Sequence, residues 1–169
     1  YVLKKSILEE IPIRLCIQER LNEWVPNFKI QKDYKHYMNV VEFCRSLTLN
    51  TINHLILKYG QDLKNNQWIL EPFSDIIISF SIIDTTFKRF YNLDEGEHKK
   101  LTENVFKLSL ANNFHEILKN SLLILEHTQE NSIIEKINHE SKILNYNPDR
   151  IQYRKNIAKD LYRHKKYYL

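Results

Sequence analysis

Glycine and proline are scarce in this chain, and that scarcity limits the folds open to it. The 169 residues include two Gly and four Pro. Tight turns between strands draw heavily on both residues, because Gly adopts positive φ without strain and Pro fixes the φ of a turn. A sheet-rich fold of this length needs many such turns, whereas a few long helices need few. We therefore predict an all-α fold.

Apolar side chains recur every three or four residues along most of the chain, which is the period of an amphipathic helix. Long helices joined by short connections pack as antiparallel neighbours. We predict an up-and-down four-helix bundle over residues 31–169, preceded by a helical arm over residues 1–30, with a short extra helix before a basic C-terminal helix. The expected helices of the bundle are Asp33 to Asp62, with Asp33 as N-cap, Gln67 to Tyr91, Glu97 to Glu126, Ser132 to Leu144 and Arg150 to Lys165.

The segment from Gln67 to Tyr91 is the best candidate for the central helix. Most of its apolar residues follow one helical face, while Ile78 and Ile82 lie off that face, so we expect this helix to be covered on two sides. Pro72 lacks a backbone donor, and we expect the helix to start or kink there. The expected inward residues are Phe73, Ile76, Ile77, Phe80, Ile83, Phe87 and Phe90, followed in the next helix by Leu101, Val105, Leu108, Phe114, Ile117, Leu118, Leu122 and Leu125.

Residues 1–30 are predicted to form an arm that leans on another surface. The most apolar stretch of the whole chain, Ile76 to Ile83, is about eight residues, far below the roughly 18 to 20 that cross a bilayer. The chain opens with Tyr1 and shows no signal peptide, so we expect a cytoplasmic protein and a piece of a longer chain. The apolar residues of the arm that would dock on a partner are Leu8, Ile11, Leu15, Leu21 and Trp24.

Metal chemistry finds little support in the sequence. A di-iron bundle needs Glu-x-x-His on two helices and a lone Glu on each of two others. The chain offers Glu95 with His98 across a turn, and Asp33 with His36 at a helix start, without a matching set of carboxylates. Seven scattered His and two Cys make no zinc cluster either. We predict no metal site in this chain.

Nucleophilic and phosphate-binding motifs are missing from the sequence. Neither Cys16 nor Cys44 lies near a His in a local sequence that would indicate a nucleophile with its base. No Gly-x-Ser-x-Gly motif occurs either. Gly60 and Gly96 alone cannot form a Gly-rich phosphate loop. We predict that the chain contains no catalytic and no cofactor-binding residues of its own.

The basic C-terminal helix is the one segment with the character of an interaction surface. Its cations alternate with tyrosines, a combination that meets phosphates and stacks on bases in nucleic-acid sites. The alternative is a solvated helix face whose charges complement the helix dipole, and the net charge of +4 is too mild to require a nucleic-acid partner. The possible anion-contact residues are Arg150, Arg154, Lys155, Lys159 and Arg163.

Three segments of the chain resemble the C-terminal extension of very-long-chain acyl-CoA dehydrogenases and their bacterial relatives. The stretch Asn53 to Asn92 is similar to the family's succession of helix end, short turn and apolar helix, with Ser74-Asp75 near the start of that helix. The tail Asn147 to Leu169 resembles its Arg-rich closing helix. The opening YVLKKSILEEIPI resembles the piece that follows the dehydrogenase core.

The resemblance implies a non-catalytic accessory domain of an FAD-dependent enzyme that desaturates fatty acyl-CoA. In that family the catalytic Glu, the flavin and the acyl-CoA belong to an upstream core, so no residue here is assigned to them. The implied partners are the catalytic domain of the same or an associated polypeptide, a second subunit in a homodimeric parent enzyme, and peripheral contact with the bacterial inner membrane. The alternative is a free-standing helical module that binds nucleic acid, an acidic partner or a membrane surface through its basic helix.

Overall fold

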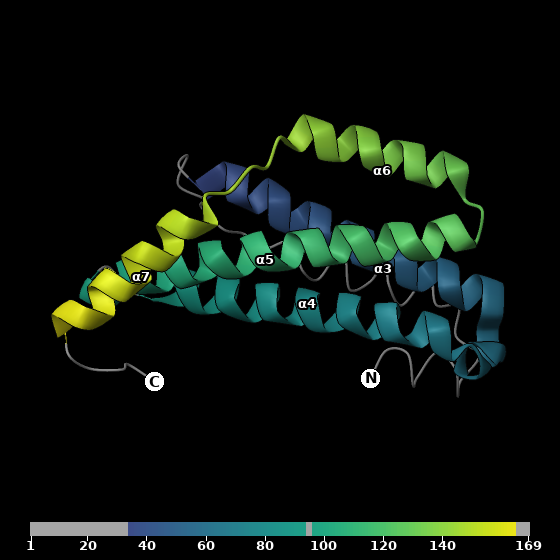
Figure 1. Cartoon of the computed structure of the whole chain (residues 1–169), viewed down its shortest axis with the longest axis horizontal. Helices are drawn as coiled ribbons and strands as arrows, with labels where there is room; N and C mark the ends of the chain where they lie inside the picture. Colours follow the sequence, from purple (N-terminus) through teal and green to yellow (C-terminus); the bar gives the residue numbers. More distant parts are fainter. Residues whose placement is uncertain (1–33, 94–95, 165–169) are drawn as a thin grey trace.

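The computed structural model describes residues 34–93 and 96–164, and the elements within those ranges are helices (Figure 1). The prediction of an all-α helical bundle is confirmed. The elements are α3 (Lys35–Tyr59), the 3₁₀ helix η2 (Gly60–Asn65), α4 (Gln67–Asn92), α5 (Glu97–His127), α6 (Asn131–Leu144) and α7 (Arg150–His164). The predicted arm over residues 1–30 lies outside the described residues.

α3, α4 and α5 run side by side along the molecule, each antiparallel to the helix before it (Figure 1). α3 ends at Tyr59, before the predicted end at Asp62, because Gly60 adopts a φ of 50° and opens η2. The Gly60 N–H is donated to the carbonyl of Ile56, which closes the last turn of α3. The predicted N-cap Asp33 lies outside the described residues. The connection between α3 and α4 is thus a 3₁₀ helix that begins at a glycine.

The central position belongs to α5 and not, as the sequence predicts, to α4. α5 packs against α3, α4, α6 and α7, whereas the α-helices that α4 contacts are α3 and α5. Phe106 and Leu110 of α5 are almost completely buried, although they fall outside the predicted inward face, while Val105 is 39% exposed against prediction. Because α5 is enclosed on several sides, its apolar residues do not gather on one face, and its sequence period is a poor guide to its burial.

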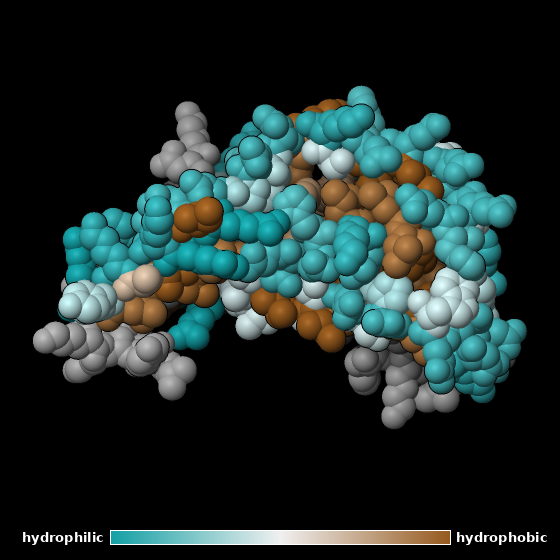
Figure 2. Space-filling model, viewed as in Figure 1, coloured by the Kyte–Doolittle hydropathy of each residue, from teal (hydrophilic) through white to brown (hydrophobic). Residues whose placement is uncertain are grey.

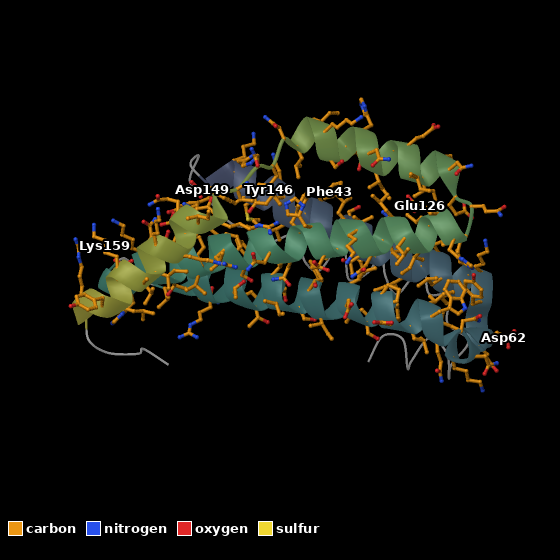
Figure 3. The ribbon with its side chains drawn as sticks, viewed as in Figure 1. Phe43, Asp62, Glu126, Tyr146, Asp149 and Lys159 are labelled. Carbon is orange, nitrogen blue, oxygen red and sulfur yellow. The ribbon has the colours of Figure 1, made fainter. Side chains whose placement is uncertain are left out.

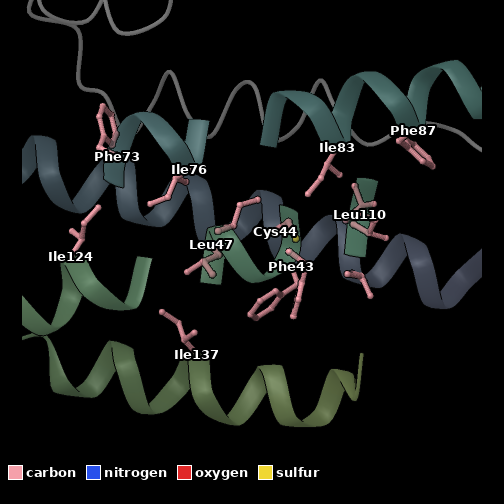
Figure 4. Packing of buried hydrophobic residues seen from close by; sticks show 14 of the residues in the cluster. Phe43, Cys44, Leu47, Phe73, Ile76, Ile83, Phe87, Leu110, Ile124 and Ile137 are labelled. Carbon is pink, nitrogen blue, oxygen red and sulfur yellow. The ribbon is translucent and has the colours of Figure 1, made fainter. Parts of the chain in front are cut away.

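The core lies where α3, α4 and α5 meet (Figure 4). Cys44 of α3, Ile76 of α4 and Leu110 of α5 have no exposed surface. Ile137 of α6 closes the core from the remaining side and is 6% exposed. Burial of each large apolar side chain stabilises the fold by roughly 1.5–3 kcal/mol. Of the inward face predicted for α4, Phe73, Ile76, Ile83, Phe87 and Phe90 are buried, and Ile77 and Phe80 are half-buried.

The outer face of α4 departs from prediction. Ile78 and Ile82, expected under a second layer of helices, are 57% and 42% exposed. Figure 2 shows apolar surface over the middle of α4, on the side away from α6. α4 also continues through Pro72, which is buried inside the helix and does not start it. α4 is therefore covered on its inner face and open on its outer face.

α6 and α7 complete the bundle at its margins. α6 returns antiparallel to α5 and packs on α5 and α3, and α7 crosses the end of the bundle where α5 begins (Figure 1). Both helices match their predicted ranges to within a residue at each end. No helix in the described part of the chain combines the length and the apolar content that a membrane span requires.

Candidate binding surfaces

The inner face of α7 fixes how this helix sits on the bundle. Asp149 caps its first turn, with Oδ1 accepting a backbone N–H at 2.8 Å. The hydroxyl oxygens of Tyr153 and Tyr37 lie 3.4 Å apart, which joins α7 to α3. Asn156 Nδ2 donates to Asn104 Oδ1 at 3.3 Å, which joins α7 to α5. These contacts determine which residues of α7 face outward.

The outer face of α7 brings most of the predicted anion-contact residues together. Arg150 is half-buried, whereas the other four predicted residues are exposed, and Figure 3 shows Lys159 on the outer side of the helix. Ile151 and Tyr162, 67% and 85% exposed, lie on the same side. Within the described residues the four exposed cations have no ion-pair partner. Such a face attracts phosphates or carboxylates. The four cations are Arg154, Lys155, Lys159 and Arg163.

A groove lies between α3 and α6 (Figure 2). Its deeper part has a volume of about 380 Å³, and a neighbouring hollow toward the end of α6 measures about 480 Å³. Both apolar and polar side chains line the deeper part. The apolar residues are Phe43, Leu47, Leu57, Ile133 and Ile137, and the polar ones are Ser46, Asn50, Asn53, His54, Lys136 and Glu140.

A polar cluster at the end of this groove ties α3 to the turn between α5 and α6. His54 Nε2 lies 3.0 Å from Thr128 Oγ1, and Lys58 Nζ donates to the Thr128 carbonyl at 2.7 Å. Glu130 lies 3.9 Å from the same imidazole nitrogen. Burial lowers the pKa of His54, opposed by the Glu130 carboxylate and supported by the Lys58 ammonium. The imidazole is therefore held in its neutral form.

The hydrogen bonds of Thr128 decide what this cluster can do. Its hydroxyl lies 3.1 Å from the carbonyl of Leu125 and 3.0 Å from His54 Nε2; when the hydroxyl donates to Leu125, the bond to His54 is donated by the imidazole Nε2–H. A nucleophilic hydroxyl needs the reverse arrangement, in which the imidazole accepts the hydroxyl proton. The cluster thus links α3 to the α5–α6 turn by hydrogen bonds. The sequence gives no sign of it, because the two residues are 74 positions apart.

Burial favours the protonated form of three other ionisable groups, Cys44, Tyr146 and Tyr153. Burial raises the pKa of the Cys44 thiol, which keeps it protonated and a poor nucleophile. Burial likewise raises the pKa of Tyr146, and burial together with the hydrogen bond to Tyr37 raises the pKa of Tyr153 to about 12. Cys44 belongs to the core, Tyr146 packs the loop before α7 against that core, and Tyr153 joins α7 to α3.

The structure tests the two metal spacings only in part. Asp33 and Glu95, the acidic members of the two pairs, lie outside the described residues, as does Cys16. His36 lies against the rings of Tyr37 and Tyr146. Across residues 34–93 and 96–164 no three His, Cys, Asp or Glu side chains come together in a group that could hold a metal ion.

The predicted core-docking residues lie outside the described residues, so their role stays a prediction. These residues are Leu8, Ile11, Leu15, Leu21 and Trp24. The surface that the sequence interpretation missed is the outer face of α4. The signal for it is present in the sequence, since Ile78 and Ile82 lie off the inward face, but that spacing alone predicts a second buried side, whereas both residues are exposed.

A scan against protein-family models, a search of curated proteins and a search of solved structures found no match to this chain.

Proposed function

We propose that the chain is the non-catalytic C-terminal helical domain of an FAD-dependent acyl-CoA dehydrogenase of the long-chain type. It would pack on the catalytic domain of the same or an associated polypeptide and support assembly of the enzyme. The catalytic domain would hold the FAD and the acyl-CoA. The observation that carries the proposal is the resemblance of Asn53 to Asn92 to the family's C-terminal extension.

The position of that stretch in the fold supports the proposal. It spans the end of α3, η2 and α4, which form one hairpin against α5. The family pattern of helix end, short turn and apolar helix therefore falls on one structural unit. The tail segment that resembles the family's closing helix coincides with α7 up to His164.

The chemistry of the described polar groups is also that of a structural domain. The His54 imidazole and the Lys58 ammonium are hydrogen-bonded to Thr128 and hold the α5–α6 turn against α3. The Cys44 thiol is buried and its pKa is raised by that burial. Tyr37 and Tyr153 are engaged with each other in fixing α7. These side chains contact neighbouring helices and the α5–α6 turn, which holds the bundle together.

An intact mass and a visible spectrum of the protein purified from its native source test the proposal. A polypeptide much heavier than 20.5 kDa, with a flavin absorption band, is the expected result. A colourless native product of about 20.5 kDa that copurifies with no flavoprotein would overturn the assignment.

The role of the arm in docking is tested by deletion of residues 1–30. The shortened chain should keep the helical circular-dichroism spectrum of the intact chain, because the described core is built from residues of α3, α4, α5 and α6. It should lose affinity for the separately expressed catalytic domain, measured by isothermal titration calorimetry, since the apolar anchors would be gone. Equal affinities of the shortened and intact chains would refute the docking assignment.

A second candidate is a binding module that uses α7. The observation that favours it is the set of four exposed cations without ion-pair partners in the described residues, beside the exposed ring of Tyr162. Fluorescence anisotropy with a single-stranded oligonucleotide should then show binding that weakens steeply with salt. The double change Lys155→Glu and Lys159→Glu should abolish it, whereas Lys142→Glu on α6 should not. Absence of binding at low salt would remove this candidate.

A further inference from the structure

The outer face of α4 carries a line of four exposed residues with a regular spacing. Glu71, Ile78, Ile82 and Arg89 follow one another at intervals of seven, four and seven residues. The whole line covers five helical turns, about 27 Å, so all four side chains lie on the same face. Each of the four is exposed, with Ile78 at 57% and Ile82 at 42%.

The neighbouring helix flanks this line and does not cover it. Thr86 lies at the edge of the face, and its hydroxyl reaches Ser109 of α5 at 3.3 Å. α5 therefore lies beside the exposed line. The other residues on the face are short and polar, among them Ser74, Ser81 and Thr85. The two isoleucines are the bulky apolar side chains in the middle of this face, whereas Trp68, 48% exposed at the start of α4, lies against His127.

The charges at the two ends of the line form no ion pair with any residue that the structure describes. Glu71 and Asp75 precede the isoleucines and Arg89 follows them, and none of the three has an ion-pair partner within the described residues. By contrast, Lys88 on the side of α4 is bonded to Asp84 at 2.7 Å. The acidic end and the basic end stand at equal distances from the midpoint of the line, at residue 80.

This arrangement is complementary to itself. If two α4 helices lie antiparallel across a two-fold axis at residue 80, Ile78 of one copy meets Ile82 of the other, and Glu71 of one meets Arg89 of the other. A parallel pair would instead bring each charge against its like. Isologous contacts require such self-complementarity of one patch.

We propose that the outer face of α4 is a self-association surface, on which the α4 of a second copy of this chain lies antiparallel. The acidic residues Glu71 and Asp75 make the face unsuited to nucleic acid or to anionic lipid. A contact limited to one helix face is small, so the dimer belongs with weak and transient interfaces. The proposal does not rest on the acyl-CoA dehydrogenase assignment, because it uses α4 alone.

Sedimentation equilibrium of the 169-residue chain over a concentration series tests the proposal. The average mass should rise from 20.5 kDa toward twice that value as concentration reaches the high micromolar range. Ile78→Lys should hold the mass at the monomer value. Leu57→Lys is the matched control, since Leu57 is 74% exposed on α3 and away from α4. Thermal melting by circular dichroism checks that both variants fold.

Charge reversal tests the antiparallel orientation. Arg89→Glu places like charges at both ends of the contact and should weaken dimerisation about tenfold, while the double change Glu71→Arg with Arg89→Glu should restore it. A chain that stays monomeric up to about millimolar concentration would overturn the proposal. So would a dimer that Ile78→Lys leaves intact, or a single reversal with no effect.

Discussion

α4 and α6 are both amphipathic helices rich in isoleucine, yet the bundle holds them very differently. α4 buries eight residues along its inner face, including Ile69, Ile76 and Ile83, whereas α6 buries one, Ile137. α4 lies in a hairpin with α5 along its whole length, and α6 rests on α5 and α3 across an open groove. The amphipathic pattern therefore predicts which face of a helix turns inward. It does not predict how many residues of that face are buried.

The comparison predicts the largest effect for a buried isoleucine of α4. Ile83→Ala should lower the free energy of unfolding by about 2–5 kcal/mol, because it removes buried methyl groups and leaves a cavity between α4 and α5. Ile78→Ala, on the same helix but facing outward, should change it by less than about 0.5 kcal/mol. Urea denaturation followed by circular dichroism measures both. Equal effects would contradict the assignment of the two faces.

An intermediate effect is expected for the single buried isoleucine of α6. Ile137→Ala should cost about 1–2 kcal/mol, less than in α4, because α6 can close onto the space left behind. Hydrogen exchange should show faster opening of α6 amides, with those of α4 and α5 unchanged. Ile143→Ala is the control, since Ile143 is 70% exposed on the same helix. Acceleration throughout the bundle would mean that α6 is as firmly integrated as α4.

The sequence predicts the helices well because the signal for them is local. The inner face of α4 is readable from the spacing of its phenylalanines and isoleucines, and α5 begins at Glu97 and ends at His127, one residue beyond the prediction. The end of α3 is predicted less exactly, at Asp62, whereas Gly60 with its φ of 50° ends the helix at Tyr59. Four of the five predicted cations of α7 are exposed, and Arg150 is half-buried.

What the sequence does not predict depends on neighbours far along the chain. Whether Ile78 is covered is decided by where the other helices lie, and the spacing of α4 residues carries no such information. The central place of α5 follows from its contacts with four other helices. The bond between His54 and Thr128 joins residues 74 positions apart. Such contacts are set by the packing of whole helices.

A smaller effect, of opposite sign, is expected in the loop that joins α6 to α7. Among the described residues the buried hydroxyl of Tyr146 has no hydrogen-bond partner, and a buried polar group left unpaired costs free energy. Tyr146→Phe should therefore stabilise the chain by about 1 kcal/mol. Tyr153→Phe, which loses the contact with Tyr37, should destabilise it by about 0.5–1 kcal/mol. Chemical denaturation compares the two; a destabilising Tyr146→Phe would show that the hydroxyl is satisfied.

The smallest expected effect is a pH dependence of the free energy of unfolding that comes from His54, whose bond to Thr128 holds the turn before α6. Burial keeps the pKa of His54 below its ordinary value of 6.5 in the folded chain. The unfolded chain then takes up the proton first, so the stability that neutral His54 contributes is complete above about pH 6.5 and is lost as the pH falls below it. His115, whose pKa is lowered by burial and by the Arg150 cation, adds to the same trend.

The contribution of His54 is isolated by comparing slopes. Between pH 7.5 and 5.5 the free energy of unfolding should fall less steeply in His54→Asn than in the unchanged chain. His115→Asn, the control, should reduce the slope by a separate amount. Because His54 bonds to the turn that leads into α6, its protonation should also speed hydrogen exchange in α6 before α4 responds. If the His54→Asn curve runs parallel to that of the unchanged chain, the imidazole is not titrating in this window. If hydrogen exchange in α4 and in α6 speeds up together, the two helices open as one cooperative unit.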